Sequence, residues 1–367
     1  MVTKTGPSDD LKFWIGFSLV PGVGPARITL LLQAFGSLRR AWEATAVELR
    51  DAGIDSRTIT SFDRRRNLLN LDAELAKLDA QGVRALCWDD AAYPQLLREI
   101  DDPPPVLYVR GQLRPEDRTA VAVVGTRKAS IYGREVTTRL VGDLARHGVT
   151  AVSGLARGID TAAHKTAIDA GGRTIAVLAC GLDIVYPAEN AALAREVVRH
   201  GALVSEHPLG VKPESSHFPR RNRIMSGLSL GVLVVEAALD SGSHITVRCA
   251  LDQNREVFAV PGSIFSPGSQ GTHRWIREGA KLVTRAEDIL EELNVAAIGQ
   301  QLELQATLPA TGSEASILRY LSQEPAHVDE VRRRSGLPIA DVSSALTMME
   351  LKGLVRHVGG MSYVSTR

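Results

Sequence analysis

The chain has 367 residues, of which 44% are hydrophobic and 23% are charged, and its net charge is +1. This is the composition of an ordinary globular protein, long enough for two or three domains. Three scattered cysteines argue against a disulfide framework or a zinc site, and no apolar run is long enough for a transmembrane helix. The N-terminus also lacks the apolar core of a signal peptide, so we expect a cytoplasmic protein without a membrane span.

Residues 11–80 are predicted to be helical, because apolar residues recur at helical spacing on both sides of the turn "PGVGPAR". This turn could present backbone amides to a phosphate, but its flanks are weakly basic, so we favour a packing role. The proline-rich segment "DDPPPVLYVRG" at 101–111 contains one short strand and marks the expected end of a helical domain over residues 1–100.

From Thr119 onward, short apolar strands alternate with helical segments. The predicted strands are "TAVAVVG", "VTAVSG", "TIAVLAC", "ALVSE", "LGVLVVEA" and "EVFAVPG". Such alternation is typical of βαβ crossovers and a mostly parallel sheet, and the nearly continuous apolar strands indicate helices on both faces. The sequence therefore predicts an α/β domain over residues 101–293.

The C-terminal part follows a segment without clear periodicity at 294–312, which we expect to be a linker. Residues 313–367 are predicted to form three helices and a hairpin with a Gly-Gly turn, an order that suggests a winged helix. The third helix, "IADVSSALTMMELKG", carries Lys352 as its single cation, and residues 291–367 hold 7 Lys and Arg against 9 Asp and Glu. We therefore interpret this unit as a protein-contact or weak duplex-binding module.

The middle of the chain carries the positive charge, with 15 Lys and Arg against 9 Asp and Glu over residues 118–228. Ligands of open α/β sheets bind beyond the carboxyl ends of the strands. Two loops at such positions contain glycines and cations, namely "GTRKAS" with Gly125, Thr126, Arg127 and Lys128, and "SGLARGID" with Ser153, Gly154 and Arg157. Glycines that admit an anion to backbone amides favour anion binding here, although solvated strand-to-helix turns would carry the same residues.

The densest cationic cluster is "FPRRNRIMSG", between the fourth and fifth predicted strands. Arginines at the start of a helix oppose its dipole and repel one another, which favours a binding role over a structural one. The candidate residues are Phe218, Arg220, Arg221, Asn222 and Arg223, joined by Ser243 from the loop after the fifth strand. Arginine suits phosphate and an aromatic ring can stack on a base, so a polyanion such as single-stranded nucleic acid is the natural ligand.

Catalytic constellations are poorly represented. The sequence contains no nucleophile elbow, paired-carboxylate spacing or metal-ligand motif. Asp160 and His164 are spaced i,i+4 on a predicted helix, where a structural hydrogen bond is favoured over a catalytic pair. We therefore predict that the protein is not an enzyme and uses no cofactor or metal.

The chain resembles the DprA/Smf family of DNA-processing proteins. The resemblance is carried by "VVGTRKASIYG", "VSGLARGIDTAAH", "TIAVLACGLDIVYPAEN", "LVSEHPLG", "FPRRNRIMSGLS", "VVEAALDSGSHITVRCAL" and "VFAVPGSIFSPGSQGTHRWIREGA", which occur in family order over about 160 residues. It implies an extended Rossmann-like core, an N-terminal domain like a sterile alpha motif or helix-hairpin-helix, and a C-terminal winged helix.

The resemblance also implies a function and site residues. The family's members bind single-stranded DNA, protect incoming DNA and load the recombinase RecA during natural transformation, commonly as homodimers. The family's glycine-Ser/Thr-Arg loop corresponds to Gly125, Thr126 and Arg127 of this chain. Its basic segment corresponds to Arg221–Arg223, preceded by the aromatic Phe218.

Two other functions stay open at this point. One is a Rossmann-like hydrolase related to nucleotide phosphoribohydrolases, because "PGSIFSPGSQGTHRW" distantly resembles their signature. In that signature a glutamate follows "GT", and this chain has Trp275 at the corresponding position. The other is an adaptor whose basic loops bind an acidic protein tail.

Overall fold

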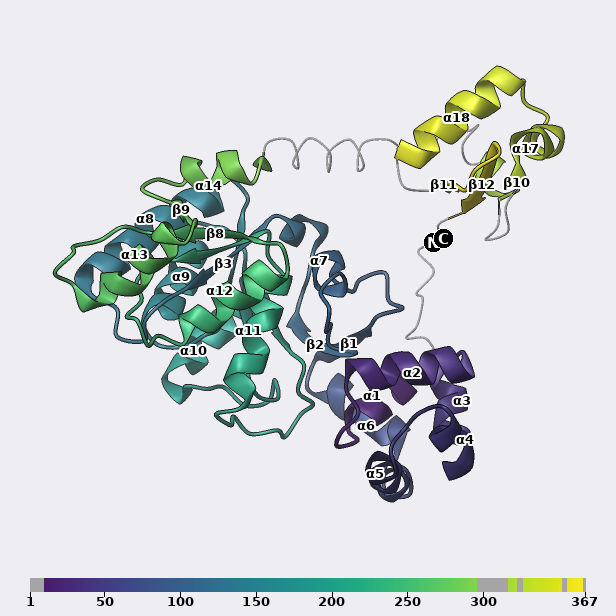
Figure 1. Ribbon diagram of the computed structural model, residues 1–367, viewed down its shortest axis with the longest axis horizontal. Helices are drawn as coiled ribbons and strands as arrows, with labels where there is room; N and C mark the ends of the chain where they lie inside the picture. Colours follow the sequence, from purple (N-terminus) through teal and green to yellow (C-terminus); the bar gives the residue numbers. More distant parts are fainter. Residues whose placement is uncertain (1–9, 296–315, 322–325, 352–354, 366–367) are drawn as a thin grey trace. The chain divides into compact units, whose positions relative to one another are not determined.

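The computed structural model describes residues 10–295, 316–321, 326–351 and 355–365 (Figure 1). The chain forms two compact units, one up to Leu293 and one from Asn294. Each unit is described by itself below. Among the described helices, none is long and apolar enough to cross a membrane.

Six helices form the N-terminal part of the first unit, as the apolar periodicity predicts. Their bounds are α1 Leu11–Ser18, α2 Pro25–Phe35, α3 Leu38–Glu43, α4 Ala46–Asp51, α5 Ser56–Arg66 and α6 Leu71–Ala80. Side chains of Ser37, Thr45, Asp55 and Asn70 accept backbone hydrogen bonds at the starts of α3 to α6 and so fix where these helices begin. The rings of Phe17, Trp42 and Phe62 lie 5.1 Å apart at the centre of the bundle.

The rest of the first unit is built on a nine-stranded sheet in the order β1-β2-β6-β5-β4-β3-β7-β8-β9. The strands are β1 Val83–Cys87, β2 Val106–Gly111, β3 Ala120–Val124, β4 Thr150–Ser153, β5 Thr174–Val177, β6 Gly201–Ser205, β7 Gly231–Val234, β8 Glu256–Ala259 and β9 Lys281–Leu282. All neighbours from β6 to β9 are parallel, whereas β1–β2 and β2–β6 are antiparallel. The predicted mostly parallel α/β fold is confirmed.

The boundary expected at residue 100 does not coincide with the edge of the sheet. β1 lies before that point in the sequence but pairs along its full length with β2. The N-terminal helices share one hydrophobic core with β1 and β2, and the hydroxyl groups of Ser18 and Tyr108 lie 3.0 Å apart across it. Sequence reasoning missed β1 because its five residues follow the helical pattern directly.

Helices cover both faces of the sheet, as Figure 1 shows. On one face, apolar residues of the strands pack against α7 Gln95–Arg98, α11 His217–Gly227, α12 Ser243–Asp252 and α13 Gln270–Arg277. On the other face, α8 Ile131–Arg146, α9 Ile159–Asp169 and α10 Ala191–His200 pack on the central strands. The small helix α14 Glu287–Glu292 follows β9. Burial on both faces explains why the central strands are nearly continuous apolar runs.

The second unit contains α17 Val328–Ser335, α18 Ile339–Leu351 and a three-stranded sheet in the order β10-β12-β11. The strands are β10 Ala326–His327, β11 Val355–His357 and β12 Ser362–Ser365. β11 and β12 form the predicted hairpin, and Gly359 and Gly360 in its turn have positive φ angles of 96° and 56°. The first predicted helix of this unit lies partly outside the described residues, as does most of the predicted linker, residues 296–312.

Candidate nucleic-acid interface

A pocket of about 640 Å³ opens beyond the carboxyl ends of β3 and β7. The chain proceeds from β3 through β4 and β5 to β6 on one side, and from β7 to β9 on the other, so this is the topological switch point of the sheet. The pocket is lined by the loops that follow β3 and β7 and by α11. The candidate residues that line it are Gly125, Thr126, Arg127, Lys128, Phe218, Arg221, Asn222 and Ser243.

The loop after β3 is held in place from below by Glu236. The backbone oxygen of Glu236 accepts a hydrogen bond from the Thr126 N–H at 2.7 Å, and its buried carboxylate accepts one from the Ser130 N–H at 2.9 Å. These bonds leave the side chains of Arg127 and Lys128 exposed. Within the described parts of the chain, no carboxylate forms an ion pair with either cation.

Two aromatic rings lie beside these cations. The Arg127 guanidinium carbon is 5.5 Å from the centroid of the Phe218 ring, a distance typical of a cation–π contact. The Tyr186 ring also lies 5.7 Å from the Phe218 ring and is 47% exposed. Because aromatic faces next to free cations can stack on bases while the cations bind phosphate, the pocket is suited to a nucleic acid.

Arg221 lines the pocket but is 5% exposed and bound to protein atoms. One of its terminal nitrogens donates hydrogen bonds to the carbonyl oxygens of Gly154, at 2.8 Å, and Val177. Burial lowers the pKa of Arg221, and the nearby Asp160 carboxylate opposes this shift. The side chain therefore ties the ends of β4 and β5 together at the floor of the pocket.

Arg223 does not line the pocket. Its guanidinium forms ion pairs with Glu206 at 2.7 Å and Asp102 at 2.8 Å. The expectation of direct phosphate contact must be corrected to this extent, because Arg223 is 10% exposed and already has two carboxylate partners, the largely buried Glu206 and the exposed Asp102. Its exposed neighbour Arg220 faces solvent, and no ion pair of Arg220 occurs among the described residues.

The second predicted loop contributes less exposed surface than expected. Arg157 is exposed, but its guanidinium donates two hydrogen bonds of 2.7 Å to the carboxylate of Glu189. Ser153 is fully buried and its hydroxyl donates to the Val123 carbonyl at 2.7 Å. A Cβ on Gly154 would lie 2.2 Å from Arg221, so a larger residue there would have to displace the guanidinium. Ser153, Gly154 and Arg157 do not line the pocket.

The residues considered for catalysis have structural partners. Asp160 accepts hydrogen bonds from the Gly154 and Ala156 N–H groups at 3.1 Å and 3.3 Å. His164 is completely buried, and its Nδ1 lies 2.7 Å from the Thr174 hydroxyl oxygen. Trp275, at the position of the hydrolase glutamate, is buried and donates to His244 Nδ1 at 2.7 Å. In the described residues, no group of three or more His, Cys, Asp and Glu side chains is placed to hold a metal ion.

A family model described as "DNA recombination-mediator protein A" matches residues 84–294. The chain belongs to this family. A second model, described as "DprA winged helix domain", matches residues 302–361 and confirms the predicted winged helix. The resemblance to DprA/Smf proteins is thus confirmed.

Several relatives in the family have similar length or fold. Protein Smf of Escherichia coli K12 is 41% identical over 338 residues, covering 88% of this chain and 87% of that protein. The X-ray structure of DNA processing protein A from Streptococcus pneumoniae is 37% identical, covers 77% of this chain and 97% of its own, and has a TM-score of 0.68. A structure on the single-stranded DNA binding mode of DNA processing protein A from Helicobacter pylori is 29% identical. The match covers 58% of this chain and 96% of that chain and has a TM-score of 0.53.

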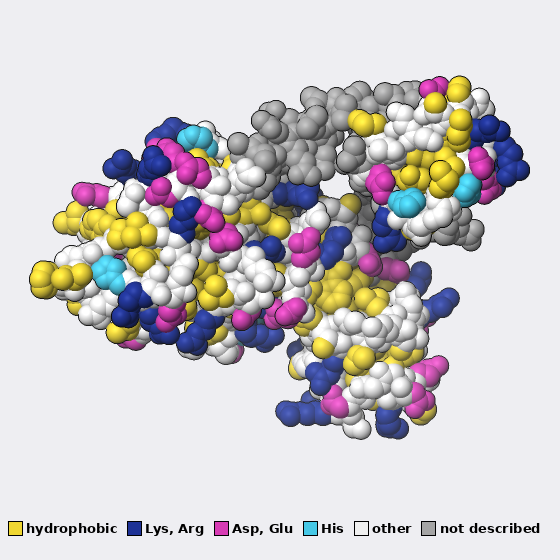
Figure 2. Space-filling view, turned by 45° about the horizontal axis from the view of Figure 1, so that its top comes forward, with side chains coloured by type: hydrophobic (Ala, Val, Ile, Leu, Met, Phe, Trp, Pro, Cys, Tyr) yellow, Lys and Arg dark blue, Asp and Glu magenta, His cyan; other side chains and the backbone are white. Residues whose placement is uncertain are grey.

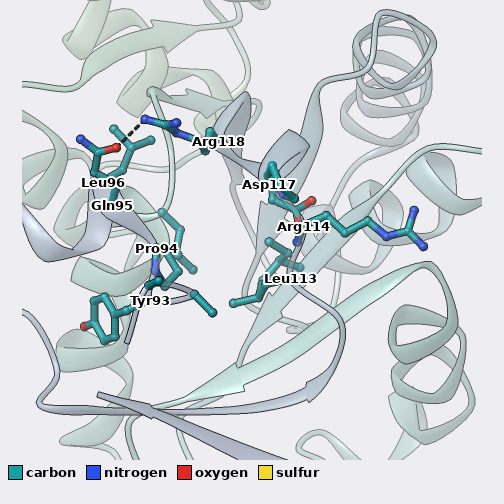
Figure 3. Close-up of a pocket in the computed structure, with 13 residues that line it drawn as sticks. Tyr93, Pro94, Gln95, Leu96, Leu113, Arg114, Asp117 and Arg118 are labelled. Atoms are coloured by element: carbon teal, nitrogen blue, oxygen red, sulfur yellow. Dashed lines mark hydrogen bonds between the residues drawn. The ribbon is translucent and has the colours of Figure 1, made fainter. Parts of the chain in front are cut away.

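A second cavity, of about 400 Å³, lies between the segment before and within α7 and the segment that precedes β3 (Figure 3). None of the predicted site residues lines it. Its lining is largely apolar, the Arg118 side chain turns to Gln95, and the Arg114 side chain points away from Tyr93 and Pro94. The switch-point pocket is therefore the better candidate for an anionic ligand.

Tyr186 is an aromatic pocket residue that was absent from the residues predicted from the sequence. It lies in "YPAEN", a stretch that reads as a turn followed by a helix cap. Its position in the sequence could have predicted it, because this segment follows β5 at the same end of the sheet as the other loops. An aromatic residue at that edge is a candidate for base stacking.

Proposed function

We propose that this protein binds single-stranded DNA in the switch-point pocket. The observation that carries the proposal is that the exposed cations Arg127 and Lys128, which form no ion pair within the described residues, line the same pocket as the rings of Phe218 and Tyr186. A mononucleotide would not require this many separate groups, whereas a strand presents alternating phosphates and bases. A relative with the same fold, DNA processing protein A of Helicobacter pylori, binds single-stranded DNA.

The cations and the aromatic rings of the pocket would bind different parts of the strand. Arg127, Lys128 and Arg220 neutralise phosphates and release counterions, which provides affinity for any sequence. Phe218 and Tyr186 stack on bases, which a duplex keeps inside its helix, so they favour unpaired strands. Arg221 holds the pocket floor through Gly154 and Val177, and it adds a buried positive charge below the bound strand.

We further propose that the protein acts in the cytoplasm as a recombination mediator, which protects incoming DNA and transfers it to RecA during natural transformation. Such a role requires a DNA groove and a separate surface for the recombinase but no reacting side chain. A homodimer would provide two grooves and raise the effective concentration of the second contact. A nucleotide hydrolase would need a glutamate at the position of Trp275. The Trp275 side chain instead donates a hydrogen bond to His244.

The binding test compares a single-stranded with a duplex oligonucleotide across a salt series. We expect tighter binding of the single strand and a steep, linear fall of log affinity with log salt. Equal affinity for both forms would contradict the proposed site. The mediator role is tested by RecA filament growth on single strands coated with single-strand-binding protein, and no acceleration by this protein would contradict that role alone.

A further inference from the structure

The loop between β8 and α13 presents two large apolar side chains to solvent. Ile264 is 76% exposed and Phe265 is 89% exposed. Neighbouring Ile131 and Tyr132, at the start of α8, are also exposed. Figure 2 shows hydrophobic side chains gathered at the end of the first unit where this loop lies in Figure 1. Contiguous exposed apolar groups of this kind mark contact sites more often than scattered ones do.

Hydrogen bonds fix the loop on both sides of its tip. The Ser266 N–H donates to the Ser263 carbonyl at 3.0 Å and the Phe265 N–H donates to the Ser263 hydroxyl at 3.3 Å. At the base of the loop, the Tyr132 hydroxyl donates to the Pro261 carbonyl at 2.6 Å. The Phe265 ring is therefore presented by a fixed turn, which reduces the entropy lost when a ligand covers it.

The same loop adjoins the switch-point pocket. The Glu236 carboxylate that accepts the Ser130 N–H also touches the returning side of this loop, where a Cβ on Gly268 would lie 2.6 Å from the other carboxylate oxygen. The carboxylate of Glu236 therefore contacts both the loop after β3 and the loop after β8. Lys128, exposed and without an ion pair among the described residues, belongs to the pocket. Tyr132, four residues further along the chain, contacts the base of the loop at Pro261.

We propose that Phe265 is a further base-stacking platform, which binds a base of the same strand outside the switch-point pocket. This inference rests on the proposed single-stranded DNA function. A phenyl ring that is 89% exposed can stack on any base, and Lys128 at the pocket offers a phosphate contact to the same strand. The strand would follow the carboxyl ends of the sheet from α11, past β3, to the loop after β8.

The test uses the full-length protein with two oligothymidines, of about 6 and about 20 nucleotides, and the longer one exceeds the usual site sizes of about 4–16 nucleotides. Phe265→Ala and Phe265→Leu should each weaken binding of the longer strand about tenfold, or about 1.4 kcal/mol, and leave the shorter one within about twofold. Phe265→Trp should restore the affinity. Leu68→Ala, which truncates an exposed apolar side chain in the turn between α5 and α6, is the matched control and should change neither affinity.

The Phe265→Trp variant also gives a direct readout, because the four native tryptophans are buried or half-buried. Its new fluorescence should be quenched when the longer strand binds. Wild-type affinity of Phe265→Ala for both strands would overturn the inference while leaving the proposed function intact. Wild-type affinity of Phe265→Leu, or a loss of self-association on sedimentation of Phe265→Ala, would also overturn it in favour of protein contact. Failure of the wild type to bind either strand would instead refute the underlying function.

Discussion

The Arg223 guanidinium lies 2.7 Å from the Glu206 carboxylate, and the two side chains are 10% and 12% exposed. Two residues earlier, Arg221 is bound to backbone carbonyls, while Arg220 is exposed. Three arginines within four positions of one helix therefore have three different environments. Removing each of them should have a different physical consequence.

Arg223→Ala should lower the free energy of unfolding by about 3–5 kcal/mol, because it leaves Glu206 as a buried charge without its partner. Urea unfolding followed by tryptophan fluorescence measures the change. Arg220→Ala is the control and should stay within about 0.5 kcal/mol of the wild type. If Arg223→Ala instead kept wild-type stability and lost DNA affinity, Arg223 would be a DNA contact after all.

Arg127→Ala and Lys128→Ala should weaken binding of all single strands about equally. Each should also flatten the slope of log affinity against log salt by about 0.7, because one phosphate contact is lost. A salt titration by fluorescence anisotropy gives both quantities. Arg139→Ala, which removes an exposed cation from the middle of α8, should leave the slope unchanged. An unchanged slope in both loop variants would exclude this loop from the interface.

Tyr186→Ala should reduce single-strand affinity about 5- to 150-fold, the range that corresponds to the loss of about 1–3 kcal/mol of stacking on one base. Tyr186→Phe keeps the ring and should bind like the wild type. Fluorescence anisotropy measures the affinity of each variant for the oligonucleotide, and the circular dichroism spectrum shows whether the variant is folded. Equal losses in the two variants would indicate that the hydroxyl rather than the ring face matters.

The sequence predicted the α/β layers and the loops of the pocket, because apolar periodicity and strand-end position are local features. It did not predict which cations are free. Glu206 and Asp102 reach Arg223 from distant parts of the chain, and Glu189 reaches Arg157 across a separate loop. Charge neutralisation by partners far away in sequence leaves no local pattern. For the same reason, the approach of Tyr186 to Phe218 became visible only in the folded chain.

The stability of the first unit should fall as the pH is lowered from about 6.5 to about 3. Complete burial, assisted by the positive charge of Arg221, lowers the pKa of His164 from 6.5 to about 3. In this pH window the unfolded chain binds a proton that the folded chain excludes, so stability present above pH 6.5 is lost on acidification.

Urea midpoints between about pH 7 and pH 4 test this dependence. His164→Gln should be less stable at neutral pH but should show a shallower loss on acidification. His147→Gln changes an exposed imidazole and should retain the wild-type profile. A profile of His164→Gln parallel to that of the wild type would show that other groups cause the acid sensitivity.

Deletion of residues 313–367 should leave single-strand affinity within a few-fold of the wild type, because the candidate interface lies entirely in the first unit. Binding of the truncated chain to the same oligonucleotide measures the effect. A loss of about 100-fold, or about 2.7 kcal/mol, would show that the winged helix contributes directly to the single-strand site.

The close approach of Arg221 to Gly154 has a consequence for how this family can diverge. A methyl group at Gly154 would lie 2.2 Å from a terminal nitrogen of Arg221, so a larger residue at this position has to displace the guanidinium. That displacement breaks the hydrogen bonds to the Gly154 and Val177 carbonyl oxygens, whereas shortening Arg221 requires no change at Gly154. The constraint therefore acts in one direction: among relatives, a larger residue at position 154 should occur together with a replaced arginine at position 221.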